Sequence, residues 1–187
     1  MKKNLKKGFT LAELLIVVAI IAVLVAIGIP IFNGQLEKSR EAYDIYTMRQ
    51  AASAAIDLYY AGVNNSASAS ENGLKWWSAG NTSNAYGVYN PENGTFSAIE
   101  PQQATPYGKG TSTDGGTSFV LGNDRGAYGS KEDYTDAVIM IAIYPLSSDK
   151  RVDVYWKNTK HKSGNTSYVG GAVGKDDPTY SIRIFLD

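Results

Sequence analysis

A single carboxylate stands inside an otherwise apolar stretch near the start of the chain. Residues 9–32 read FTLAELLIVVAIIAVLVAIGIPIF, in which the only polar side chains are those of Thr10 and Glu13. A carboxylate within an apolar helix costs about 2.5–3.5 kcal/mol when the helix enters a membrane. An ionisable group in such a place is by default a functional residue, and a partner for its charge has to be found.

The stretch that holds Glu13 is long enough to cross a membrane. As an α-helix its 24 residues span about 36 Å, against about 30 Å of bilayer hydrocarbon. Four lysines precede it, namely Lys2, Lys3, Lys6 and Lys7. Because positive charge is retained in the cytoplasm, they predict a single-pass protein in the cytoplasmic membrane, with its N-terminus inside and its C-terminus outside.

Three kinds of segment share this pattern: a secretory signal peptide, a permanent anchor and a prepilin signal. The small residues of Ala26-Ile27-Gly28 suit a signal peptidase. However, the apolar run exceeds the usual hydrophobic region of about 7–15 residues. Neither a signal peptide nor a plain anchor gains anything from Glu13.

The residues around Gly8 favour the third interpretation. The sequence KKGFTLAE at residues 6–13, followed by the apolar run, resembles the processing motif of the type IV pilin family, which is shared by type II secretion pseudopilins. The resemblance implies cleavage between Gly8 and Phe9 and methylation of the new N-terminal Phe9. It also implies that Glu13 pairs with the Phe9 ammonium of a neighbouring subunit, which would offset the burial of both charges.

The helix is expected to continue beyond the apolar stretch. Pro30 matches the family pattern, and because it removes one helical hydrogen bond we expect bending or loosening there. Residues 35–61 predict a helix with one apolar stripe, formed by Ile45, Met48, Ala52, Ile56 and Tyr59. Asn33-Gly34 is a turn signal, whereas the family usually has one continuous helix, and both alternatives remain open.

The remaining sequence predicts an α+β head. Residues 62–116 are rich in Asn, Ser, Thr and Gly and predict a long loop, in which Trp76 and Trp77 are packing anchors. Four strands are predicted at residues 117–122, 137–144, 151–156 and 180–186. The short connection at residues 145–150 favours an antiparallel hairpin. The fold class is therefore a long N-terminal helix whose second half packs on a four-stranded antiparallel sheet, as in the pilin fold.

No chemistry of an enzyme is evident in the head. The 18 basic and 18 acidic side chains leave an acidic remainder once the N-terminal lysines are set aside, which argues against nucleic-acid binding. Absence of cysteine excludes a disulfide or a thiolate site. His161 lies in a polar turn, and none of the carboxylates follows calcium-loop spacing, including Asp124, Glu132, Asp133, Asp176 and Asp177. We predict no catalytic residue, no metal and no cofactor.

These observations predict four segments: a cleaved leader (residues 1–8), a transmembrane and filament-core helix (9–32), its amphipathic continuation (33–61) and a globular head (62–187, with the sheet in 117–187). The resemblance implies a subunit of a cell-surface pilus for motility or adhesion. Its implied partners are further copies of the chain in a helical homopolymer, a prepilin peptidase and methyltransferase, the assembly platform with its ATPase, and the membrane before assembly. A minor pilin, a pseudopilin of a secretion or DNA-uptake system, and an adhesin head are the alternatives.

Overall fold

A computed structural model of the chain describes residues 8–80, 82–112, 119–120, 126–160, 168–170 and 178–187. The chain divides into two compact units, Met1–Leu36 and Glu37–Asp187. We call the second unit the head. Lys2, Lys3, Lys6 and Lys7 lie outside the described residues, as do His161, Asp124, Asp176 and Asp177.

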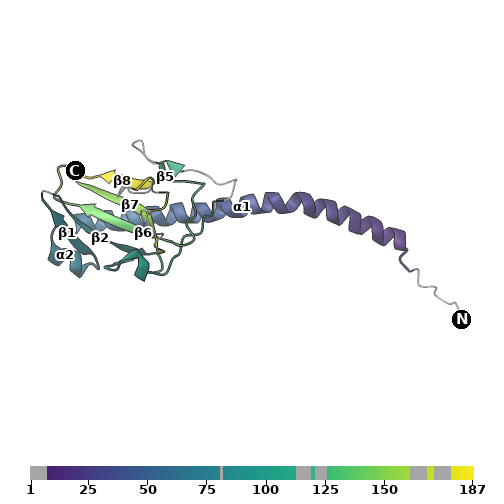
Figure 1. Cartoon of the computed structure of the whole chain (residues 1–187), viewed down its shortest axis with the longest axis horizontal. Helices are drawn as coiled ribbons and strands as arrows, with labels where there is room; N and C mark the ends of the chain where they lie inside the picture. Colours follow the sequence, from purple (N-terminus) through teal and green to yellow (C-terminus); the bar gives the residue numbers. More distant parts are fainter. Residues whose placement is uncertain (1–7, 81, 113–118, 121–125, 161–167, 171–177) are drawn as a thin grey trace. The chain divides into compact units, whose positions relative to one another are not determined.

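The longest element is helix α1, Leu11–Tyr60 (Figure 1). It continues through Pro30 and through Asn33-Gly34, so the alternative of a break at Asn33-Gly34 is wrong. The loosening expected at Pro30 does not interrupt the helix either. A proline removes only one helical hydrogen bond. A glycine inside a helix lowers helix stability by about 1 kcal/mol. These losses are local, and the helix continues because the other backbone hydrogen bonds are kept.

The head is built on a six-stranded antiparallel sheet. Its strands follow the order β1-β2-β6-β7-β8, and β3 also pairs with β2. The bounds are β1 Lys75–Ala79, β2 Thr82–Asn90, β3 Thr95–Ser97, β6 Ala137–Tyr144, β7 Arg151–Asn158 and β8 Ser181–Phe185. The remaining elements are α2 Ser66–Glu71, the 3-10 turn η1 Pro101–Gln103, and a separate two-stranded sheet of β4 Phe119–Val120 and β5 Gly126–Tyr128.

Strand β6 lies at the centre of the sheet and is buried on both faces. Ile139, Ile141 and Ile143 belong to the main core together with Met48 and Ala52 of α1. Val138 and Met140 form a second apolar cluster with Val88. Each fully buried aliphatic side chain of this kind stabilises the fold by about 1.5–3 kcal/mol. The predicted hairpin is confirmed, because Tyr144 pairs with Arg151 across residues 145–150.

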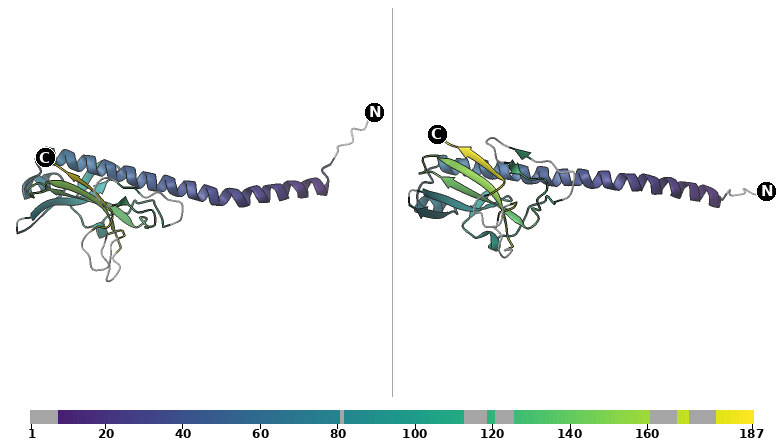
Figure 2. Two further views of the ribbon diagram at one scale, coloured as in Figure 1. Left: turned by 90° about the horizontal axis from the view of Figure 1, so that it is seen from above. Right: turned by 45° about the horizontal axis from the view of Figure 1, so that its top comes forward.

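The head half of α1 covers one face of this sheet, as the left view of Figure 2 shows. The predicted stripe is confirmed as the covering face: Met48 and Ala52 are buried, and Ile45, Ile56 and Tyr59 are partly buried against the same core. The α+β fold class, with a long helix and an antiparallel sheet, is therefore confirmed.

The predicted loop at residues 62–116 is wrong, since it contains α2, β1, β2, β3 and η1. The sheet consequently has six strands instead of four. Strand β2 lacks a strongly apolar pattern, because small residues occupy positions on its packed face: Ala85 is fully buried in the main core, and a Cβ on Gly87 would lie 2.8 Å from Leu74 Cδ2. Tertiary packing, rather than strand propensity, selects this segment.

The predicted strand at residues 117–122 is only partly confirmed. Phe119–Val120 forms β4, which pairs with β5 in the smaller sheet instead of joining the main one. The last predicted strand corresponds to β8, in which Ile182 is fully buried.

Only one of the two tryptophans is a packing anchor. Trp76 packs against the main core, whereas Trp77 is 47% exposed. Successive side chains of a strand point to opposite faces, so adjacent tryptophans on β1 cannot both face the helix.

Three acidic side chains of α1, Glu37, Glu41 and Asp44, are buried in the head, which the sequence pattern did not predict. Asp44 accepts hydrogen bonds from the backbone N–H groups of Lys109 (2.9 Å) and Gly110 (2.7 Å), and from Tyr128 Oη (3.0 Å). Burial raises the pKa of Asp44 to about 6, although these hydrogen bonds lower it in part.

Glu37 accepts a hydrogen bond from the backbone N–H of Thr111 and lies 3.5 Å from Arg40 Nη1. Together with Asp44 it fastens residues 109–111 to the helix. The buried carboxylates therefore satisfy backbone donors of a segment that belongs to no helix or strand.

Candidate functional site

The predicted processing junction lies just before α1 begins. Gly8, Phe9 and Thr10 are outside the helix and exposed, and Phe9 is 89% exposed. A Cβ added to Gly8 would meet no atom of the described residues within 4 Å. The peptide bond between Gly8 and Phe9 is therefore accessible, and packing within the described part of the chain does not require a small residue at Gly8.

Glu13 has a partner within its own chain. Its Oε2 accepts hydrogen bonds from the backbone N–H and the Oγ1 of Thr10, both at 2.8 Å, and its own N–H donates to Thr10 Oγ1 at 3.2 Å. This reciprocal arrangement is a capping box, which satisfies donors at the start of a helix. The S/T-x-x-E spacing of Thr10 and Glu13 is a known sequence signal for it, and our sequence interpretation of Glu13 missed it.

The capping box leaves the carboxylate at the surface. Within the described residues Glu13 is exposed, and it accepts the Thr10 bonds in that position. Its Oε1 takes part in none of these three bonds. A second donor could therefore reach the same carboxylate without displacing Thr10.

The apolar side chains that follow are exposed along the whole N-terminal unit. Residues 11–33 are all exposed, including Leu24 (64%) and Phe32 (67%). Large continuous apolar surfaces of this kind mark a protein or membrane interaction site. By length and composition, α1 is the helix among the described residues that could cross a membrane.

Pro30, the third residue expected to act in assembly, lies inside α1 and within this exposed surface. The structure brings Glu13 to Thr10, whereas the side chains of Phe9 and Pro30 are exposed. Among the described residues no group of three His, Cys, Asp or Glu side chains gathers where it could hold a metal ion.

Known proteins resemble this segment and not the whole chain. The prokaryotic N-terminal methylation motif matches residues 3–29. The type IV major fimbrial protein FimA of Dichelobacter nodosus is 55% identical over 40 residues, which is 21% of this chain and 25% of the relative. A fimbrial protein of the same organism matches to the same extent. The chain thus spans about a quarter of the curated relatives it matches, and no solved structure matches it.

The methylation motif and the exposed apolar helix define the N-terminal segment as one of the prokaryotic N-terminal methylation kind. This segment is therefore similar to the N-terminal segment of type IV fimbrial proteins, and the fold of the chain is α+β, with a long N-terminal helix and an antiparallel sheet.

Proposed function

We propose that the chain is a structural subunit of a type IV pilus, cleaved after Gly8 and polymerised through its N-terminal helix. The observation that carries the proposal is a methylation motif at residues 3–29 that includes the start of α1, whose apolar side chains are exposed among the described residues. A helix that is apolar all round requires lipid or other helices around it.

The proposal gives each N-terminal residue a role. Gly8 presents the scissile bond to a prepilin peptidase, and Phe9 supplies the new ammonium group and is methylated. Lys2, Lys3, Lys6 and Lys7 hold the leader (residues 1–8) in the cytoplasm. The protein is thus N-in and C-out in the cytoplasmic membrane first, and it reaches the cell surface after assembly by a platform and its ATPase.

Assembly transfers the apolar surface of residues 9–32 from lipid to a core made of the same segment in other subunits. Lipid chains are as apolar as leucine, so the transfer itself is nearly neutral and specificity has to come from packing and polar pairs. Pairing of Glu13 with the Phe9 ammonium of a neighbour supplies such a polar pair, and Pro30 shapes the helix that packs there.

The names of the relatives support a fibre subunit over a minor pilin or pseudopilin, because FimA is called a major fimbrial protein and the other relative a fimbrial protein. Immunogold labelling of sheared surface fibres with antibodies against the head tests this choice. Labelling along the whole fibre is the expected result. Labelling confined to tips, or absence of the chain from fibres, would contradict the major-pilin proposal.

A further inference from the structure

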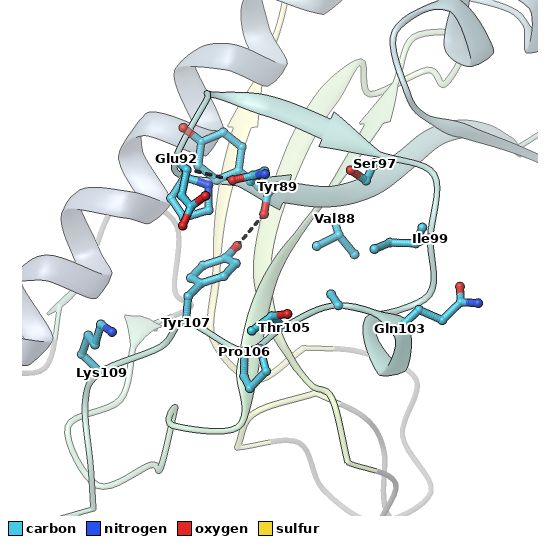
Figure 3. A pocket seen from close by; sticks show the side chains of 13 residues that line it. Val88, Tyr89, Glu92, Ser97, Ile99, Gln103, Thr105, Pro106, Tyr107 and Lys109 are labelled. Atoms are coloured by element: carbon cyan, nitrogen blue, oxygen red, sulfur yellow. Dashed lines mark hydrogen bonds between the residues drawn. The ribbon is translucent and has the colours of Figure 1, made fainter.

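The head carries an open groove that assembly through the N-terminal helix does not use. It has a volume of about 580 Å³ and lies between the end of β2, the residues around β3, and the segment from Gln103 to Lys109. Figure 3 shows the side chains that line it. Its volume falls in the range of small-molecule sites, about 300–1,000 Å³.

One aromatic ring in the groove is held in a fixed position. Tyr107 Oη donates a hydrogen bond to the backbone carbonyl of Tyr89 (2.9 Å) and accepts one from the backbone N–H of Ile139 (2.8 Å). Its ring also packs against Trp156, with centroids 5.7 Å apart. The ring therefore offers a pre-organised apolar surface, which Val88 and Ile99 extend.

Two carboxamides at the groove have their oxygens already engaged. Asn90 Oδ1 accepts a hydrogen bond from the backbone N–H of Glu92 (2.9 Å), and Gln103 Oε1 accepts one from that of Glu100 (3.0 Å). These bonds orient both side chains. Within the described residues neither NH₂ group donates a hydrogen bond, so both are available to a ligand.

The charges at the groove balance. Glu92 and Lys109 contribute one of each sign, both exposed, and the hydroxyls of Ser97 and Thr105 complete the polar lining. An anionic or cationic ligand gains no net attraction from such a surface. The groove thus combines the aromatic ring of Tyr107 with neutral amide and hydroxyl groups. A ligand with apolar C–H faces and uncharged hydroxyl groups is complementary to this combination.

We propose that this groove binds a neutral saccharide, whose ring stacks on Tyr107 and whose hydroxyls pair with Asn90 and Gln103. A peptide is a poorer match, because strand addition requires an open edge. Val88 is already paired with Ser97 of β3 on one side and with Met140 of β6 on the other. The site is independent of the proposed assembly function, since all its residues belong to the head.

Saturation-transfer NMR on the full-length chain tests the proposal, with the protein in micelles of a detergent without a sugar headgroup. The probes are glucose, galactose, mannose, N-acetylglucosamine and N-acetylgalactosamine. N-acetylneuraminic acid, glucuronate and a proline-rich peptide are the comparison ligands. We expect saturation of the ring protons of at least one neutral sugar and none of the anionic sugars or the peptide.

Two variants locate the binding. Ala104→Trp fills the groove and should weaken Kd at least ~10-fold, whereas Ala98→Trp, on a nearby exposed residue that does not line it, should change Kd less than ~2-fold. Gln103→Glu keeps the acceptor for Glu100 and removes the donor, so it should weaken binding ~3-fold or more. Absence of binding to every neutral sugar, preference for an acid or the peptide, or equal loss in both tryptophan variants would overturn the proposal.

Discussion

The two halves of helix α1 differ in what surrounds them. Residues 11–33 have every side chain exposed, whereas the half from Glu37 to Tyr60 has one face buried against the sheet. The first half is apolar except for Glu13 and Asn33, whereas the second buries apolar residues such as Met48 and Ala52 together with the acidic residues Glu37, Glu41 and Asp44. One part of a helix can therefore be stabilised by packing against the sheet of the same chain, while the other part requires lipid or other protein chains to cover its apolar surface.

The largest effect is expected from blocking cleavage between the leader (residues 1–8) and the exposed half of α1. Gly8→Arg should abolish cleavage, because a long charged side chain then stands beside the scissile bond. Immunoblotting of membranes should detect only the uncleaved chain. Gly8→Ala is the matched control and should be cleaved; a processed chain beginning at Phe9 in Gly8→Arg would contradict the role of Gly8.

The next prediction separates two roles of Glu13. Glu13→Ala should leave cleavage intact and reduce fibre yield strongly, because breaking a buried ion pair costs about 3–5 kcal/mol. Thr10→Val removes the capping partner but keeps the carboxylate, and loss of a cap costs about 1 kcal/mol. Sheared-fibre yields should therefore fall much further in Glu13→Ala. Equal fibre yields in the two variants would mean that Glu13 acts only as a helix-capping residue and would contradict its pairing with Phe9 of a neighbouring subunit.

A matched pair of isoleucine-to-alanine changes, one in the core of the head and one in the exposed half of α1, tests which half contributes to the stability of the head. Ile141→Ala should destabilise the purified chain in micelles by about 2–5 kcal/mol, because Ile141 is fully buried on β6. Ile20→Ala, at an exposed position of α1, should change head stability by less than about 0.5 kcal/mol. Urea unfolding followed by tryptophan fluorescence measures both. A comparable loss in both variants would mean that the halves are not energetically separate.

The smallest expected effect is the contribution of Asp44 to the pH dependence of folding stability. Its pKa of about 6 in the folded chain lies above the ordinary 3.8, so the folded state binds a proton more tightly than the unfolded state between these values. Stability therefore falls as pH rises from about 4 to 6 and is level above that, with a total of about 2–3 kcal/mol from this group. Urea midpoints at pH 4 and pH 7 should lie closer together in Asp44→Asn.

Asp57→Asn is the control for this pH dependence, because Asp57 is an exposed acid on the same helix. It should leave the difference between the two midpoints unchanged. An unchanged difference in Asp44→Asn would show that other groups dominate this pH range.

The sequence predicted those features whose signals are local. The apolar run at residues 9–32, the stripe through Met48 and Ala52, and the continuous run of β6 each follow from periodicity or composition. The helix and the central hairpin were therefore predictable, and so was the N-terminal motif, which also matches the known methylation motif.

The missed features depend on contacts between distant residues. Strand β2 is a strand because Gly87 allows close packing against Leu74 and because β6 pairs beside it. Asp44 is buried because residues 109 and 110 present two N–H groups to it. The dipeptide Gly80-Asn81 was a local hairpin signal in the sequence that could have been used, and Gly80, which follows β1, adopts a φ of 58°.

The measurement that tests the central claim most directly is the N-terminal sequence of the mature protein, with its intact mass. The account predicts a chain that begins at Phe9, carries one methyl group on that residue and retains the exposed apolar helix. A mature chain that begins at Ile29, as expected for a secretory signal peptide, would contradict it, and so would a chain that retains Met1.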